Sequence, residues 1–256
     1  NKNSSLIPAV SEVMMMTHVS ISVDGLVSEG MLRQFNDMPG IDLEADYWNP
    51  EFMDSLAIDD MYFLGFNDFN ILYTHVIAFN KTILEKYDDA LEKSVYELVD
   101  DHEWTITQMI DLAKVAFINN GSVDKNQYGF TGLQWVPWCG FLEGCGINLV
   151  EMNDEGNYEV SFYNEENKDK TIALVGMLKD LAAAEYSCVD YWSFELTVPF
   201  TSNRALMTLS STSQLTEYLN YDIDFGIVPY PLYDKNQTEY RSLQWGGYLA
   251  IPAYLE

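Results

Sequence analysis

The sequence predicts an α/β fold, because short apolar runs typical of strands alternate with longer helical patterns along the chain. Residues 71–80 are rich in aromatic and β-branched side chains and are expected to form a strand. Residues 168–184 carry apolar side chains at helical spacing, which indicates a long amphipathic helix. The chain shows no internal repeat or heptad array, so solenoids and coiled coils are excluded.

Composition indicates a folded protein with an acidic surface. The 256 residues can bury a full core in one or two domains. The 40 acidic and 13 basic residues give a net charge of −27, which disfavours nucleic acid and anionic lipid as partners. The three cysteines, Cys139, Cys145 and Cys188, are odd in number and lack CxxC spacing, so neither a disulfide framework nor a zinc site is predicted. Cysteine usage leaves the compartment undecided.

The first half of the chain predicts short elements. Residues 12–16 fit a buried strand, and residues 24–35 fit two short helical turns separated by Gly30. Residues 61–65 are expected to form another short strand. Thr105 is a suitable N-cap, with Gln108 three residues later, for a helix that continues to Phe117. Trp104, just before this cap, is expected to lie in the core. A helix entry is predicted within residues 132–146, and a short strand over residues 157–163.

The second half ends in a strongly patterned segment. Residues 205–209 predict a strand, followed by a hydroxyl-rich turn at 210–213 and the start of a helix. A second strand over residues 225–229 is expected to end at the surface, because Pro229 and Pro231 remove backbone donors. Gly246 and Gly247 predict a hinge at residues 245–248, since glycine permits sharp turns and close approach.

The order of these motifs resembles that of a known family. The segments N-R-A-L-M-T-L-S-S, D-F-G-I-V-P-Y-P and L-Q-W-G-G-Y-L-A-I-P-A follow one another between Asn203 and Ala253. Y-E-L-V-D-D-H-E-W-T, at residues 96–105, adds a further match. Together they resemble the ABC-transporter extracellular solute-binding proteins of family 1, of the sugar-binding, clostridial type. The loop at residues 121–129 resembles a calcium-loop-like family segment but keeps only Asp124 of its acids, so no metal is predicted.

The resemblance implies a periplasmic-binding-protein-like fold of type II with two lobes. Residues 1–72 would be part of the first lobe, and residues 73–80 the strand that crosses to the second. Residues 81–243 would form the second lobe, and residues 244–256 the return crossing and the start of another first-lobe segment. The second lobe would be mostly present and the first incomplete, as in a fragment that lacks N-terminal and C-terminal parts of the family.

The function implied by the resemblance is capture of a carbohydrate, expected to be an oligosaccharide, in a cleft between the lobes. The ligand would pass to the permease subunits of an ABC importer, and no cofactor is implied. The protein would be extracellular, held at the outer face of the cytoplasmic membrane of a Gram-positive-type bacterium by a lipid anchor that this chain does not contain.

The sequence contains little evidence for a catalytic function. The G-x-S-x-G, H-E-x-x-H and Walker A motifs are absent, so no catalytic residue is predicted. A carbohydrate-active hydrolase or a stand-alone carbohydrate adhesion module remains the alternative. Proteins bind sugars by stacking aromatic side chains on the apolar ring face and by hydrogen-bonding the hydroxyl groups with polar side chains. For each tryptophan, burial in the core is the alternative role. The predicted ligand-binding residues are His18, Ser20, Asn67, Asp68, Trp135, Trp138, Ser210, Ser211, Gln244, Trp245 and Tyr248.

Overall fold

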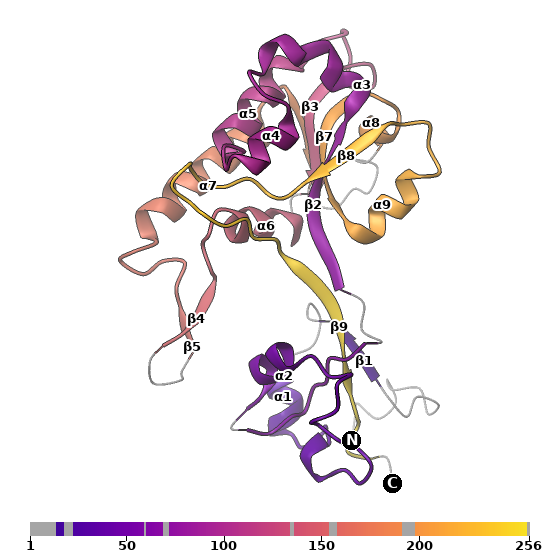
Figure 1. Ribbon diagram of the computed structural model, residues 1–256, viewed down its shortest axis with the longest axis vertical. Coiled ribbons are helices and arrows are strands. Elements are labelled where there is room, and N and C mark those ends of the chain that lie inside the picture. Colours follow the sequence, from indigo (N-terminus) through magenta and orange to yellow (C-terminus); the bar gives the residue numbers. More distant parts are fainter. Residues whose placement is uncertain are drawn as a thin grey trace. The chain divides into compact units, whose positions relative to one another are not determined.

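The fold contains both helices and strands, as the sequence predicts (Figure 1). A computed structural model describes residues 14–17, 23–58, 60–68, 72–133, 136–153, 158–190 and 198–254. The chain divides into two compact units. Unit 1 contains residues 1–72 and 245–256, and unit 2 contains residues 73–244.

Unit 1 is the smaller unit and is built around a pair of antiparallel strands. Strand β1 pairs with β9 from Met14 opposite Ala250 to Thr17 opposite Gly247. On β9, Leu249 also exchanges both backbone hydrogen bonds with Gly65, at 2.8 and 2.9 Å. The elements that contribute to this unit are β1 (Met14–Thr17), α1 (Val23–Ser28), η1 (Phe35–Asp37), α2 (Pro50–Leu56) and β9 (Gln244–Ala250).

The prediction of a strand over residues 61–65 is wrong. Met61 and Gly65 form only isolated bridges, to Ile58 and Leu249. The backbone between them is satisfied by the η1 region instead. Tyr62 accepts a hydrogen bond from the Phe35 amide at 2.7 Å, and its own amide donates to the Asn36 side chain at 2.9 Å.

Unit 2 contains a mixed sheet with strand order β2-β7-β3-β6, and β8 also pairs with β2. Strand β3 is parallel to both β7 and β6, whereas β2 is antiparallel to β7 and β8. A separate hairpin is formed by β4 and β5. The strands are β2 (Leu72–Asn80), β3 (Tyr128–Leu133), β4 (Val150–Met152), β5 (Tyr158–Val160), β6 (Ser187–Asp190), β7 (Ala205–Ser211) and β8 (Phe225–Val228).

Helices flank this sheet (Figure 1). They are α3 (Lys81–Leu84), η2 (Glu85–Ala90), α4 (Val95–Asp100), α5 (Ile106–Val115), α6 (Val136–Gly144), α7 (Lys168–Ala183), α8 (Val198–Thr201) and α9 (Thr212–Tyr218). The predicted cap at Thr105 is confirmed, because its hydroxyl accepts a hydrogen bond from the Gln108 amide at 3.3 Å. Helix α5 ends at Val115, two residues before the predicted Phe117.

Helix α5 lies directly against the central strands because Gly129 has no side chain. A Cβ atom at this position would overlap the Ala113 carbonyl of α5. Any larger residue would therefore push the helix away from β3, whose two neighbours β7 and β6 depend on its position.

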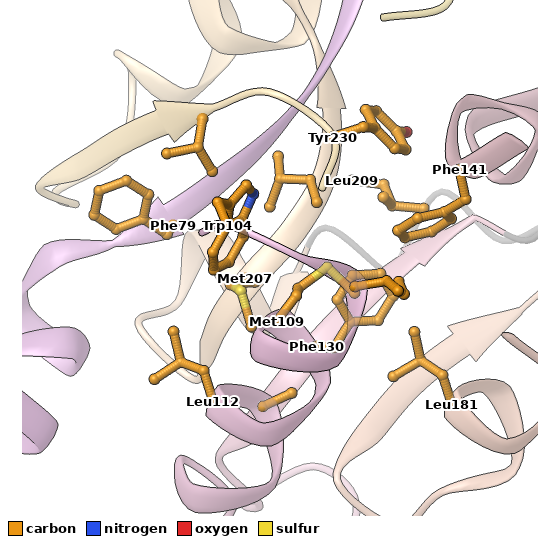
Figure 2. Packing of buried hydrophobic residues seen from close by; sticks show 14 of the residues in the cluster. Phe79, Trp104, Met109, Leu112, Phe130, Phe141, Leu181, Met207, Leu209 and Tyr230 are labelled. Atoms are coloured by element: carbon orange, nitrogen blue, oxygen red, sulfur yellow. The ribbon is translucent and has the colours of Figure 1, made fainter. Parts of the chain in front are cut away.

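The core of unit 2 is centred on Trp104, as predicted (Figure 2). Its side chain is 0% exposed, and its indole Nε1 donates a hydrogen bond to the Pro229 carbonyl at 3.1 Å. Met109 and Met207 are buried in the same cluster, from α5 and β7. The indole thus connects the start of α5 to the segment that follows β8.

The prediction that the chain reaches the surface after β8 is wrong. Tyr230, Pro231 and Leu232 are all buried. The segment satisfies its backbone against the loop before α5, because the Leu232 amide donates to the Trp104 carbonyl at 3.0 Å and the Ile106 amide to the Leu232 carbonyl at 2.8 Å. Proline here ends the strand and leads the chain into the core.

Two other boundaries differ from the predictions. Ser210 and Ser211, placed in a turn, are the last residues of β7, and α9 begins directly at Thr212. The glycine pair of the expected hinge lies within the regular strand β9. The predicted long helix is α7, which buries Leu174, Leu178 and Leu181 and leaves the apolar side chains of Ile172 and Val175 exposed. Among the described residues, no helix is both long and apolar enough to cross a membrane.

Helix α6 contains one acidic residue in an unfavourable environment. Glu143 is partly buried, and the loss of water around it raises the pKa of its carboxyl group, an effect that Arg241 only partly offsets. Ionisation of this group therefore opposes folding.

Replacing Trp104 with Ala should lower the free energy of unfolding by roughly 3–5 kcal/mol, because it leaves a large cavity and an unpaired Pro229 carbonyl. Denaturant unfolding followed by circular dichroism measures this loss. The exposed Tyr221 is a matched control, and Tyr221→Ala should change stability by less than about 0.5 kcal/mol. Equal losses in the two variants would contradict the core assignment.

Replacing Glu143 with Gln should raise the melting temperature at pH 7. The folded-state pKa of Glu143 lies above the ordinary value of 4.5, so the penalty is present above the folded pKa and disappears as the pH falls below 4.5. Thermal melts from pH 4 to pH 7 should show a gain that grows with pH. Glu185→Gln, at an exposed position, serves as the control, and a gain that did not depend on pH would refute the explanation.

Candidate functional site

The directions of the strands in unit 2 place the ends of several strands at one edge of the sheet. Because β3 is parallel to β7 and β6, the carboxyl ends of these three strands lie at the same edge. Strand β2 is antiparallel to β7, so it begins there, with His75 opposite Ser211. In open α/β sheets, ligands bind outside the carboxyl ends of the strands. This edge is therefore the candidate site of unit 2.

Hydroxyl groups gather where β7 ends. Ser211 is 7% exposed, and its Oγ lies 3.4 Å from the Oγ of Ser213. Thr212 starts α9, and its Oγ1 accepts a hydrogen bond from the Thr74 amide at 3.2 Å. This last bond ties the beginning of β2 to the beginning of α9. The edge thus presents a small group of hydroxyls on a fixed backbone.

Gln244 reaches the same edge from the other side of β2. The His75 amide donates a hydrogen bond to the Leu243 carbonyl at 2.9 Å, which places the exposed Gln244 beside the start of β2. Two of the predicted residues, Ser211 and Gln244, are therefore brought together around His75.

The other predicted residues of unit 2 are placed differently. Ser210 is 1% exposed, and its hydroxyl donates to the Ser211 carbonyl at 3.5 Å, so it is part of the packed interior. Trp138, in the first turn of α6, packs edge-on against Phe141 with ring centres 5.7 Å apart. Its indole Nε1 is buried without a hydrogen-bond partner among the described residues. Ligand contact by these two side chains stays a prediction.

Sequence reasoning missed one aromatic residue at this edge. Tyr73 is 37% exposed, although its strand, β2, is buried from His75 onwards. An exposed ring beside a group of hydroxyls is a typical platform for an apolar ligand face. In the sequence, Tyr73 stands near the start of a strand-forming run, and the first residues of a strand lie at the edge of a sheet.

In unit 1, Tyr248 belongs to strand β9, whereas Asn67 and Asp68 lie against the loop at Tyr47 and Trp48. Asn67 bridges Trp48, and the Asp68 amide donates to the Tyr47 carbonyl at 3.1 Å, which leaves the Asp68 side chain exposed. Tyr248 packs against Phe66 with ring centres 6.2 Å apart. Burial raises the pKa of the Tyr248 phenol, so this hydroxyl stays protonated at neutral pH.

Some predictions fall on residues without a described position. His18, Ser20 and Trp135 lie outside the described residues, as does the side chain of Trp245, whose backbone belongs to β9. Within the described part of the chain, no group of three or more His, Cys, Asp or Glu side chains is arranged to hold a metal ion.

Comparison with protein families decides what kind of protein this is. A family model described as bacterial extracellular solute-binding protein matches residues 8–256, which is nearly the entire chain. The chain belongs to the bacterial extracellular solute-binding proteins. The resemblance drawn from the sequence motifs is thereby confirmed. Members of this family bind solutes outside the cell. A search of curated proteins found no match to the chain.

A solved structure shows the same fold. The GacH receptor of Streptomyces glaucescens GLA.O, determined unliganded and in complex with acarbose and an acarbose homologue, superimposes with a TM-score of 0.70 at 16% sequence identity. The match covers 100% of this chain and 60% of the receptor chain. The predicted solute-binding-protein fold is therefore confirmed, and this chain spans little more than half the length of that receptor.

Proposed function

We propose that this solute-binding protein captures a carbohydrate, and more narrowly an oligosaccharide, for delivery to the permease subunits of an ABC importer. The observation that carries the proposal is the polar edge of unit 2, where Ser211, Thr212 and Gln244 lie beside the start of β2, which also carries the exposed ring of Tyr73. A sugar presents an apolar ring face and a rim of hydroxyls. The aromatic ring suits the apolar face, and the hydroxyl and amide side chains suit the rim.

The two units are proposed to act as lobes that close on the ligand. In this proposal residues 1–72 belong to the first lobe and residues 81–243 to the second, with crossings at 73–80 and 244–256. Only two chain passages connect the units, between residues 72 and 73 and between residues 244 and 245. Few connections permit a hinge motion in which a small number of backbone angles change.

The proposal includes a contribution from each unit. Ser211 and Gln244, from unit 2, would hydrogen-bond sugar hydroxyls. Asp68 and Asn67, from unit 1, would do the same through carboxylate and amide groups, and Trp245 would stack on a sugar ring. The protein would act outside the cell without cofactor or catalysis, attached to the membrane by a lipid.

Titration calorimetry tests this function with oligosaccharides of the maltose, cellobiose, mannobiose and xylobiose series. The expected result is saturable binding of at least one series, and chromatography should show the bound sugar intact after prolonged incubation. Cleavage above background would replace transport with a hydrolase function. If no sugar binds, carbohydrate capture is refuted.

Replacing Trp245 with Ala should weaken sugar binding by roughly 1–3 kcal/mol, which is the contribution of a desolvated aromatic contact. Thermal stability should change less than in Trp104→Ala. Trp245→Phe is the matched control, because it keeps a ring and should keep most of the affinity. Unchanged binding in Trp245→Ala, or failure of that variant to fold, would assign the residue to packing.

A further inference from the structure

Unit 2 contains a cavity with mostly polar lining residues, none of which is among the predicted site residues. It lies between the start of α7 and the loop at residues 233–241, and its volume is about 660 Å³. Pockets for small molecules typically enclose ~300–1,000 Å³. The cavity therefore has room for one or more sugar units.

The loop that forms one wall of the cavity is held in place by Gln237. Its Nε2 donates to the Gly144 carbonyl at 2.7 Å and to the Glu239 carbonyl at 2.8 Å. Its Oε1 accepts from the Tyr233 amide at 3.1 Å. A single side chain thus fastens both ends of the loop to the end of α6. The cavity is formed before any ligand arrives, which lowers the entropic cost of binding.

The lining has the chemistry that a polyhydroxylated ligand needs. Tyr233 supplies an aromatic ring, with the Lys170 ammonium 5.1 Å from its centre. Asn236 and Thr238 line the cavity with an amide and a hydroxyl, which can both donate and accept hydrogen bonds. Arg241 donates to the Asn148 side chain at 3.2 Å, which fixes its guanidinium at the rim. One ring and several convergent polar groups are typical of sugar subsites.

The cavity lies close to the candidate site along the chain. Arg241 lines the cavity, and Gln244 lies three residues later beside the start of β2. Three residues span at most about 11 Å, even when fully extended. Figure 1 shows the chain between β8 and β9 passing beside α6 on its way to β9. An extended ligand at Gln244 could therefore continue into the cavity.

We propose that this cavity is a distal subsite, which binds the outer units of an oligosaccharide whose inner units occupy the edge at Ser211 and Gln244. The inference rests on the proposed function and makes it more specific. It selects extended ligands of several units over disaccharides. The four carboxylates of the lining outnumber its two cations, so it takes neutral units and rejects acidic ones such as uronic acids.

The test compares the chain-length dependence of binding in the parent protein and in a cavity variant. The double variant Asn236→Ala/Thr238→Ala removes two hydrogen-bonding side chains and keeps the Gln237 contacts. Calorimetry uses the maltose, cellobiose, mannobiose and xylobiose series, from two to six units. In the parent, affinity should rise with length. The variant should lose about tenfold for the longest sugar and remain unchanged for the disaccharide.

Two further variants make the result specific. Asn236→Trp fills the cavity and should abolish the gain from added units without changing disaccharide binding. The matched control Thr216→Ala/Asn220→Ala removes the same side-chain types from exposed positions of α9 and the turn after it, and should behave as the parent.

The outcomes separate the two proposals. If affinity in the parent does not depend on length, or if the cavity variants weaken short and long sugars equally, the distal subsite is refuted while carbohydrate capture stands. If no sugar binds to the parent protein, both proposals fail together.

Discussion

The antiparallel pairing of β2 with β7 is the constraint on which the rest of unit 2 depends. Strand β7 is buried at all seven positions, so it must be covered on both faces and paired along both edges. Its parallel neighbour β3 requires helical crossovers, whereas its antiparallel neighbour β2 reverses direction at the same edge. Because of this reversal, the beginning of β2 meets the end of β7. The hydroxyls of Ser211 and Thr212 therefore lie beside the chain passage at residues 72–73.

The sequence predicted correctly those elements that are determined by residues close together in the chain. The Thr105 cap, the strand over residues 72–80 and the long helix of residues 168–183 all follow from side chains close in sequence. Failures occurred where distant partners decide the outcome. Tyr230 and Leu232 are buried because the loop before α5 offers backbone partners to the segment after Pro229. No local pattern contains that information.

The candidate site residues were predicted from the family resemblance, and their ligand contacts stay predictions. Of these residues, Ser211 and Gln244 are the ones that the structure places at strand ends beside the start of β2, since Ser211 ends β7 and Gln244 begins β9. Ser210 is one position further inside the strand and differs from Ser211 only in register, which sequence alone does not fix. Tyr73 was missed because an aromatic residue in a strand-forming run is equally expected to pack.

The charge of the protein disfavours anionic solutes. A net charge of −27 places any anionic ligand in a repulsive field, whereas a neutral ligand experiences no such force. Recognition of a neutral solute must then come from hydrogen bonds and ring contacts at short range, and these require side chains that are held in place before binding. Gln237 and Thr212 both show this arrangement. The side chain of each hydrogen-bonds to a backbone group and so holds in place the chain segments that carry the proposed ligand-binding side chains. An acidic surface with uncharged hydroxyl groups at the sheet edge fits the proposed carbohydrate ligand better than a phosphorylated or carboxylated solute.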